Sequence, residues 1–200
     1  MTALSNCGAS DFGGVVEVDE KFFRESRKGS LEWARHQRDP VNHPKPDRMR
    51  WVDYKLTGTK LPAGISKYQI PVITMADRAG ARRADVLPDH SAPPLIAVLA
   101  RCLRRDAVLC SDRDPAYDFF ARQHAVPHYR IDAKKGPFVI DKAFHIQTIN
   151  SLHDRFERFM SPFRGPATSN LTGYTSWFIA RSVRKEKERI EDAWDRVTAA

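Results

Sequence analysis

Residues 13–23 read GGVVEVDEKFF, and this stretch decides the fold class. Its valines alternate with Glu17 and Asp19, which is the two-residue period of a β-strand. Glu17 and Asp19 therefore share one face of the predicted strand, and Asp19 lies late in it. The ordered part of the chain thus begins with a strand that carries two acidic side chains on one face.

Helices and further strands follow this first strand. Residues 24–67 are rich in Pro, Gly, Arg and Lys, and they predict a long basic loop or insertion. The periodicity then predicts a strand hairpin, a helix, a strand, a helix, a strand and two more helices, at residues 67–89, 93–103, 107–112, 115–124, 127–132, 149–163 and from 171 onward. Ser91 is expected to cap the first of these helices by accepting a hydrogen bond from a first-turn amide. This order predicts an α/β fold built on a mixed sheet.

The composition is that of a globular chain of one-domain length with a surplus of positive charge. The chain has 200 residues, of which 42% are hydrophobic and 29% charged, so it is neither a disordered nor a fibrous sequence. Its 33 Lys and Arg residues outnumber its 25 Asp and Glu residues, which gives a formal net charge of +8. Such a surplus favours nucleic acid as the partner, and a well-solvated basic surface is the alternative.

Three features set expectations about location. The longest apolar stretch, Leu95–Ala100, is far shorter than the roughly 20 residues that cross a bilayer, so no membrane partner is expected. The N-terminal MTALSNCGAS lacks the basic and apolar regions of a secretory signal. The three cysteines form no C-x-x-C pair, which argues against a disulfide framework. We therefore expect a cytoplasmic protein.

Two aspartates fall at the ends of predicted strands. Asp19 is late in the first strand, and Asp112 ends the strand AVLCSD. In an open mixed sheet, ligands and metal ions gather beyond strand ends, where rigid backbone holds the carboxylates. Two such carboxylates can share divalent cations that act on a phosphodiester, whereas a single one is more often a turn or cap residue.

Three stretches carry a resemblance to a known family. They are FGGVVEVDEKFFRESRKG at residues 12–29, VLCSDRDPAYDFFARQHAVPHYRI at residues 108–131 and FHIQTINSLHDRFERFMSPFRGPATSNLTGYTSWF at residues 144–178. Each is similar to a catalytic stretch of the insertion-sequence transposases of the ISXO-like group, whose catalytic core has a ribonuclease-H-like fold. The resemblance covers about residues 12–178.

The resemblance implies the fold, the domain boundaries and the site. It implies a ribonuclease-H-like catalytic domain at residues 12–180, after a short tail at 1–11 and before a charged C-terminal helix at 181–200. Asp19 and Asp112 match the two metal-binding aspartates, and Asn150 matches the third position, where many relatives have glutamate. The neutral Asn150 amide can still coordinate through its oxygen; an ordinary helix-surface residue is the alternative.

The resemblance also implies the chemistry and the partners. Mg²⁺ or Mn²⁺ would support DNA cleavage and strand transfer by two-metal phosphoryl transfer, with no small-molecule cofactor. The partners would be double-stranded DNA at the transposon ends and further copies of the chain in an active homo-oligomer.

Two departures from the family pattern bear on activity. Glu157 stands seven residues after Asn150, where the family usually carries a lysine, and the charge is therefore reversed. Arg155 or Arg158 is a candidate substitute for that lysine. Only eleven residues precede the first stretch, too few for the zinc-ribbon and helix-turn-helix region of related transposases. A truncated, non-catalytic DNA-binding remnant is thus the alternative function, and a stand-alone nuclease of the same fold is a third.

Several polar residues near these positions stay open. His153 lies one helical turn after Asn150 and could orient it or contact a scissile phosphate, or be an ordinary polar helix residue. Glu17 and Glu20 could be auxiliary metal ligands or the solvated flank of the strand.

Overall fold

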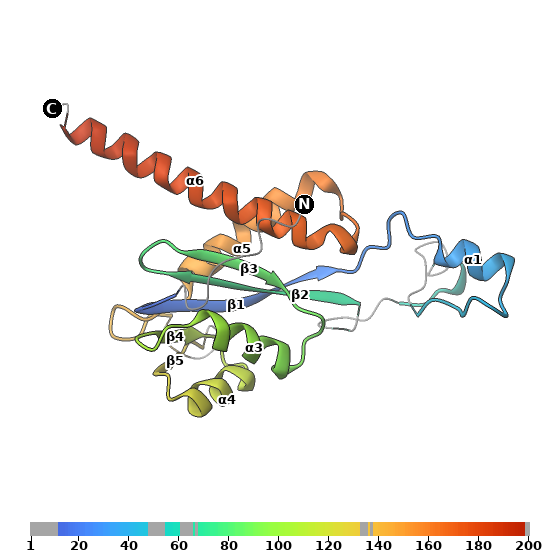
Figure 1. Cartoon of the computed structure of the whole chain (residues 1–200), viewed down its shortest axis with the longest axis horizontal. Coiled ribbons are helices and arrows are strands. Elements are labelled where there is room, and N and C mark those ends of the chain that lie inside the picture. Colours follow the sequence, from blue (N-terminus) through green and yellow to red (C-terminus); the bar gives the residue numbers. More distant parts are fainter. Residues whose placement is uncertain are drawn as a thin grey trace.

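The chain folds around one mixed five-stranded sheet (Figure 1). The computed structural model describes residues 12–47, 55–60, 66, 68–132, 136 and 138–198. The strands are β1 (Val15–Arg24), β2 (Gln69–Asp77), β3 (Arg82–Val86), β4 (Val108–Ser111) and β5 (His128–Arg130). Their order is β3-β2-β1-β4-β5; β2 is antiparallel to β1 and β3, whereas β4 is parallel to β1 and β5. The predicted mixed α/β fold is confirmed.

Helices cover both faces of this sheet. The described helices are α1 (Glu32–Arg38), α3 (Ala92–Cys102), α4 (Pro115–His124), α5 (Gln147–Met160) and α6 (Leu171–Thr198). Figure 1 shows α3 and α4 on one face, and α5 with the first part of α6 on the other. No helix within the described residues has the length and apolar character needed to cross a membrane.

The alternation along β1 divides its side chains between two cores. Val16 and Val18 are fully buried among residues of α3 and α4, which include Leu99 and Phe120. Glu17, which lies between them, points to the opposite face of the sheet, where Phe156 of α5 belongs to the second core. Because burial on both faces fixes the register of β1, the alternating acidic residues also have fixed directions.

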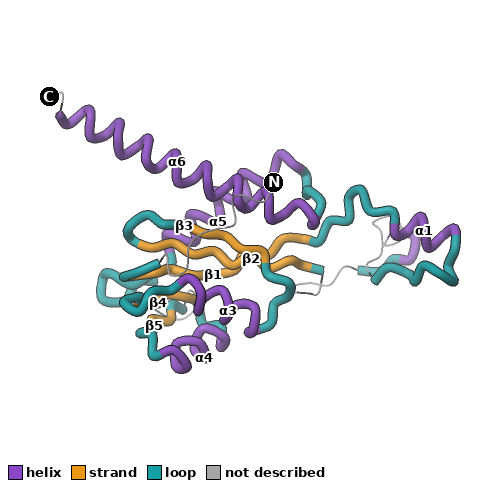
Figure 2. Tube along the Cα trace, viewed as in Figure 1, coloured by secondary structure: helices purple, strands orange, loops and turns teal. Residues whose placement is uncertain are grey.

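The segment predicted as a basic loop contains an ordered helix. Helix α1 lies beyond the ends of β1 and β2, away from the body of the sheet (Figure 2). Backbone and side-chain bonds join the start of the segment to the α5–α6 connection: Ser26 N donates to Thr168 Oγ1 and Thr168 N donates to Ser26 O, both at 2.8 Å. The sequence prediction missed α1 because only seven residues form it within a Pro- and Gly-rich surround.

The expected cap of α3 is wrong in its chemistry. Ser91 occupies the N-cap position in extended conformation, but its side chain caps no helix amide. The Ser91 hydroxyl donates instead to Oδ1 of Asp89. Since Asp89 accepts from both the hydroxyl and the backbone amide of Ser91, the local turn directs the serine side chain toward Asp89 and away from the helix amides.

Candidate active site

The middle of β1 and the end of β4 bring two predicted metal ligands next to each other. Asp19 lies mid-strand rather than late in the strand, because β1 continues to Arg24 along its antiparallel partner β2. These strands are parallel and pair Glu17 with Cys110. The same register, continued by two residues on each strand, sets Asp19 beside Asp112. Asp112 directly follows β4, and its Oδ1 accepts a hydrogen bond from the backbone N of Asp114 at 3.0 Å. The sheet thus holds the two carboxylates on neighbouring rigid strands.

The electrostatics of Asp19 reflect this proximity. Burial raises the pKa of Asp19 to about 7, and the negative charge of Asp112 adds to the rise. A hydrogen bond from the backbone N of Glu20 and the positive charge of Lys21 act in the opposite direction. A second negative charge beside Asp112 is therefore costly unless a cation compensates it.

Glu20 lies on the other face of β1 and extends the acidic region toward α4. Burial raises the pKa of Glu20 to about 7, while a hydrogen bond from the buried Tyr117 hydroxyl lowers it. The charges of Asp19 and Asp112 raise it further. Glu20 is thus no solvated strand flank, because a buried phenol holds its carboxyl group.

His153 comes from α5 and closes the site over Asp19. Its Nε2 lies 2.6 Å from Oγ1 of Thr74 on β2, and the Thr74 hydroxyl donates to the backbone O of Asp19 at 2.9 Å. The hydroxyl has one proton, so Nε2 must donate to Thr74 and Nδ1 carries a lone pair. This Nδ1 lies 3.7 Å from Oδ2 of Asp19. Burial and the charge of Lys21 lower the pKa of His153 to about 4, which keeps the ring neutral.

Asn150 lies in the first turns of α5, three residues before His153. Its side chain is exposed and makes no polar contact with the described residues. The structure therefore brings Asp19, Asp112 and His153 together and leaves Asn150 at the surface of the helix that carries His153. His153 is 8% exposed, so it is a buried residue of α5, and its role in orienting Asn150 or contacting a phosphate stays a prediction beside the alternative of an ordinary polar helix residue.

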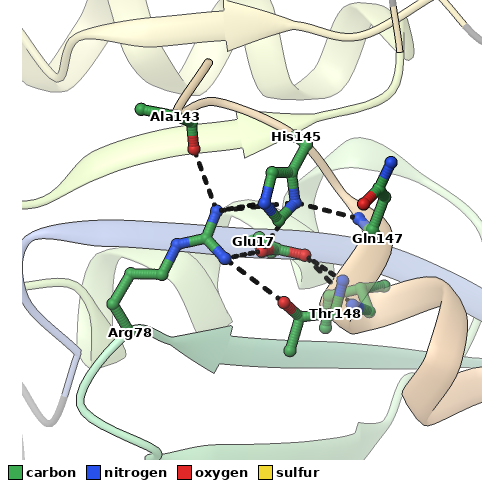
Figure 3. A network of polar contacts seen from close by, with 7 residues as sticks. Glu17, Arg78, Ala143, His145, Gln147 and Thr148 are labelled. Carbon is green, nitrogen blue, oxygen red and sulfur yellow. Dashed lines mark hydrogen bonds and ion pairs between the residues drawn. The ribbon is translucent and has the colours of Figure 1, made fainter. Parts of the chain in front are cut away.

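Glu17 fixes the position of α5 (Figure 3). Its side chain is buried, and Oε2 accepts hydrogen bonds from the backbone N of Thr148 at 2.8 Å and of Ile149 at 3.1 Å. These amides belong to the first turn of the helix, where no residue of the helix can accept from them. Oε1 lies 2.8 Å from Nη1 of Arg78 and 3.3 Å from Nδ1 of His145. Glu17 thus caps α5 from a neighbouring strand, and its burial rules out a solvated strand flank, while the auxiliary-ligand role stays a prediction.

Arg78 joins this cap to the connection before α5. Its Nη2 donates to the backbone O of Ala143 at 3.0 Å and lies 3.1 Å from Nε2 of His145, while Nη1 lies 3.3 Å from Oγ1 of Thr148 (Figure 3). One guanidinium therefore contacts three residues around the helix start. Because Asn150 follows Thr148 by two residues, this network determines where Asn150 lies.

Lys21 provides a positive charge beside Asp19. Lys21 Nζ lies 2.8 Å from Oε2 of Glu157. Glu157, which stands where the family pattern has a lysine, therefore contacts a lysine that β1 supplies. Arg155 and Arg158, the candidate substitutes, line a groove against α6 instead. The strand period could have found Lys21, since Lys21 follows Asp19 by two positions and faces the same side.

The donors of the site fit a hard divalent cation. Within the described part of the chain, no set of three or more His, Cys, Asp or Glu side chains is arranged to hold a metal ion. The fit rests on the Asp19–Asp112 pair, whose carboxylate oxygens Mg²⁺ prefers and whose repulsion a cation would relieve.

A mixed five-stranded sheet with paired aspartates on its neighbouring parallel strands β1 and β4 is compatible with a ribonuclease-H-like domain of the transposase kind. The family model described as ISXO2-like transposase domain matches residues 11–174, so the chain belongs to this transposase family. The comparison with curated proteins finds no match. The resemblance carried by the three sequence stretches is therefore confirmed.

Proposed function

We propose that this transposase domain cleaves DNA at the ends of an insertion sequence and joins the cut strands by metal-dependent phosphoryl transfer. The observation that carries the proposal is the Asp19–Asp112 pair, with Asp19 in the middle of β1 and Asp112 just after β4. Burial and mutual charge raise the pKa of Asp19 to about 7, which is an unfavourable arrangement for two structural carboxylates. A cation-binding role explains why the fold keeps them side by side.

Asp19 and Asp112 would hold Mg²⁺ or Mn²⁺ through carboxylate oxygens, with the amide oxygen of Asn150 as the third ligand. When bound, such ions activate the nucleophile, water or a 3′-hydroxyl, and stabilise the leaving oxygen of the phosphodiester. The capped start of α5 sets the position of Asn150, and the Thr74–His153 bond holds His153 against Asp19.

His153 acts beside the metal ligands as a neutral acceptor. Its Nε2 proton is committed to Thr74, so Nδ1 can accept a proton or a hydrogen bond near Asp19 but cannot donate one. Orientation of Asp19 and acceptance of a hydrogen bond are the roles that this neutral tautomer allows, since full proton transfer to Nδ1 would charge the buried ring. Donation to a scissile phosphate through Nδ1 would need the charged ring, which burial disfavours.

Membership of a transposase family implies DNA as the partner. We propose double-stranded transposon ends as the substrate, since the formal charge of +8 favours a polyanion. The active form would be a homo-oligomer, with one copy acting on each end.

The test is an assay of cleavage and strand transfer on the element's own terminal repeats with Mg²⁺ or Mn²⁺. Asp112→Ala is expected to lose both activities, whereas Asp106→Ala, which removes an exposed carboxylate paired with Arg104, should retain them. Cleavage that Asp112→Ala leaves unchanged would contradict the proposal. Cleavage without joining would indicate the stand-alone nuclease.

A DNA-binding remnant without catalysis is the second candidate. Two observations favour it: Asn150 adds no negative charge to the metal site, and the exposed Glu157 would repel a phosphate. The same assay separates the two functions, since the remnant would bind the terminal repeats without cutting them under any metal condition.

A further inference from the structure

A groove of about 440 Å³ runs between the second half of α5 and the first half of α6. Its size falls in the range of about 300 to 1,000 Å³ that is usual for ligand pockets. The lining residues are Arg155, Arg158, Phe159, Pro162, Phe163, Trp177, Phe178, Arg181 and Ser182. Aromatic rings and arginines thus form most of this groove, and the proposed chemistry uses none of them.

The groove lies on a different side of α5 from the acidic site. Successive helix residues are about 100° apart, so Arg158, Arg155 and Phe159 point roughly 80°, 140° and 180° away from Asn150. His153 and Glu157 point within about 60° of Asn150. A ligand in the groove would therefore contact the domain at a place separate from the aspartates.

An exposed tryptophan stands over a layered aromatic cluster. Trp177 is 50% exposed, although its ring lies 5.0 Å from Phe159 at 84° and 5.8 Å from Phe163. Beneath it, Phe178 is buried and stacks on Phe156 at 4.5 Å. The packed rings below hold Trp177 in place, while half of its surface remains open to solvent.

The charge of the groove is entirely positive. Three lining residues are arginines, and none is acidic. Arg158 donates through Nε to the backbone O of Asp154 at 3.3 Å, and neither Arg158 nor Arg181 forms an ion pair with another described residue. Positive charge beside an open aromatic ring is the combination that binds single-stranded nucleic acid, since phosphates contact the arginines and a base stacks on the ring.

We propose that this groove binds unpaired nucleotides of the DNA substrate, with a base stacked on Trp177 and the adjoining phosphates on Arg158 and Arg181. The proposal rests on DNA being the partner of the domain. It specifies unpaired rather than duplex DNA, because stacking requires a base face that paired DNA keeps within its own stack. Strand cleavage at a DNA end would supply such nucleotides next to the acidic site.

The experiment measures binding of a labelled duplex with a single-stranded overhang by fluorescence anisotropy in EDTA, with the blunt duplex as the second probe. Trp177→Ala is expected to weaken overhang binding about tenfold. Arg158→Ala and Arg181→Ala should each lower the magnitude of the salt slope by about 0.7, the value for one phosphate contact of a single strand. Arg122→Ala, an exposed arginine on α4, is the matched control and should bind as the wild type does.

Trp177→Phe keeps an aromatic ring and should bind more tightly than Trp177→Ala, and thermal unfolding verifies that each variant folds. Equal overhang affinity of Trp177→Ala, Arg181→Ala and the wild type would overturn the proposal. So would a loss of self-association in Trp177→Ala without a change in DNA binding, which would make the groove a contact between copies. Because EDTA excludes cleavage, this measurement reports binding alone, and failure of the catalytic proposal would leave it unaffected.

Discussion

Lys21 on β1 and Glu157 on α5 form an ion pair of 2.8 Å beside the Asp19 carboxylate. The hydrogen bond and charge of Lys21 lower the pKa of Glu157, which favours the ionised carboxylate. Lys21 also acts on its other neighbours, since its charge lowers the pKa values of both Asp19 and His153. The Lys21 ammonium group therefore links Glu157, where the charge is opposite to that of the family's lysine, to the proposed metal ligand Asp19.

This relationship predicts unequal effects of removing its two members. Lys21→Met should lower cleavage at least tenfold, because it removes the cation nearest Asp19, whereas Glu157→Gln should retain or raise activity. The exchanged variant Lys21→Glu with Glu157→Lys should recover most of the activity lost in Lys21→Glu alone. Glu157→Gln should alter the free energy of unfolding by less than about 1 kcal/mol, since the Glu157 side chain is 69% exposed. Cleavage rates and urea unfolding measure both quantities, and equal losses in Lys21→Met and Glu157→Gln would contradict the prediction.

A second prediction concerns metal-linked stability. Burial is the main cause of the raised pKa of Asp19, and the charge of Asp112 adds to it. Asp112→Asn removes this added repulsion, so without metal it should be more stable than the wild type. Mg²⁺ in the millimolar range should raise the Tm of the wild type and raise that of Asp112→Asn much less. Thermal unfolding with and without Mg²⁺ measures both effects, and Asp106→Asn is the exposed control. A wild-type Tm that Mg²⁺ leaves unchanged would argue against metal binding at these aspartates.

The alternation along β1 is visible in the sequence, whereas the contacts that complete the site join residues far apart in the chain. Alternation correctly places Glu17 and Asp19 on one face, and it also assigns Lys21 to that face. Which groups meet them is decided by the docking of α5, because Lys21 and Glu157 are 136 positions apart. The contact between Tyr117 and Glu20 likewise joins residues 97 positions apart. No local pattern contains these pairings, so a single sequence indicates the acidic strand but not its partners.

Glu17 is predicted to be a positioning residue whose loss affects both stability and activity. Glu17→Ala leaves the first-turn amides of α5 and the Arg78 guanidinium without their buried acceptor, which should cost about 2–4 kcal/mol of unfolding free energy. Glu17→Gln keeps an acceptor oxygen and should cost less. Hydrogen exchange at the Thr148 and Ile149 amides should quicken in Glu17→Ala before it does in the centre of the helix. Unchanged exchange at these two amides would show that Glu17 does not hold the helix start.

His153 should make the stability of the domain depend on pH in a defined direction. Its folded pKa is about 4, below the ordinary value of 6.5, so between these values the unfolded chain binds more protons at this position. The contribution of His153 is therefore complete above about pH 6.5 and is lost as the pH falls toward 4. The stability difference between the wild type and His153→Gln should shrink over that range, by at most about 3 kcal/mol. Urea unfolding of both proteins from pH 4 to 8 measures the difference. The raised pKa values of Asp19 and Glu20 make stability change with pH in the opposite direction, but both proteins contain these residues, so their effects cancel in the difference. Nitrogen NMR should show the His153 proton on Nε2 throughout the neutral range. A stability difference between the wild type and His153→Gln that grows as the pH falls would contradict a neutral, buried His153.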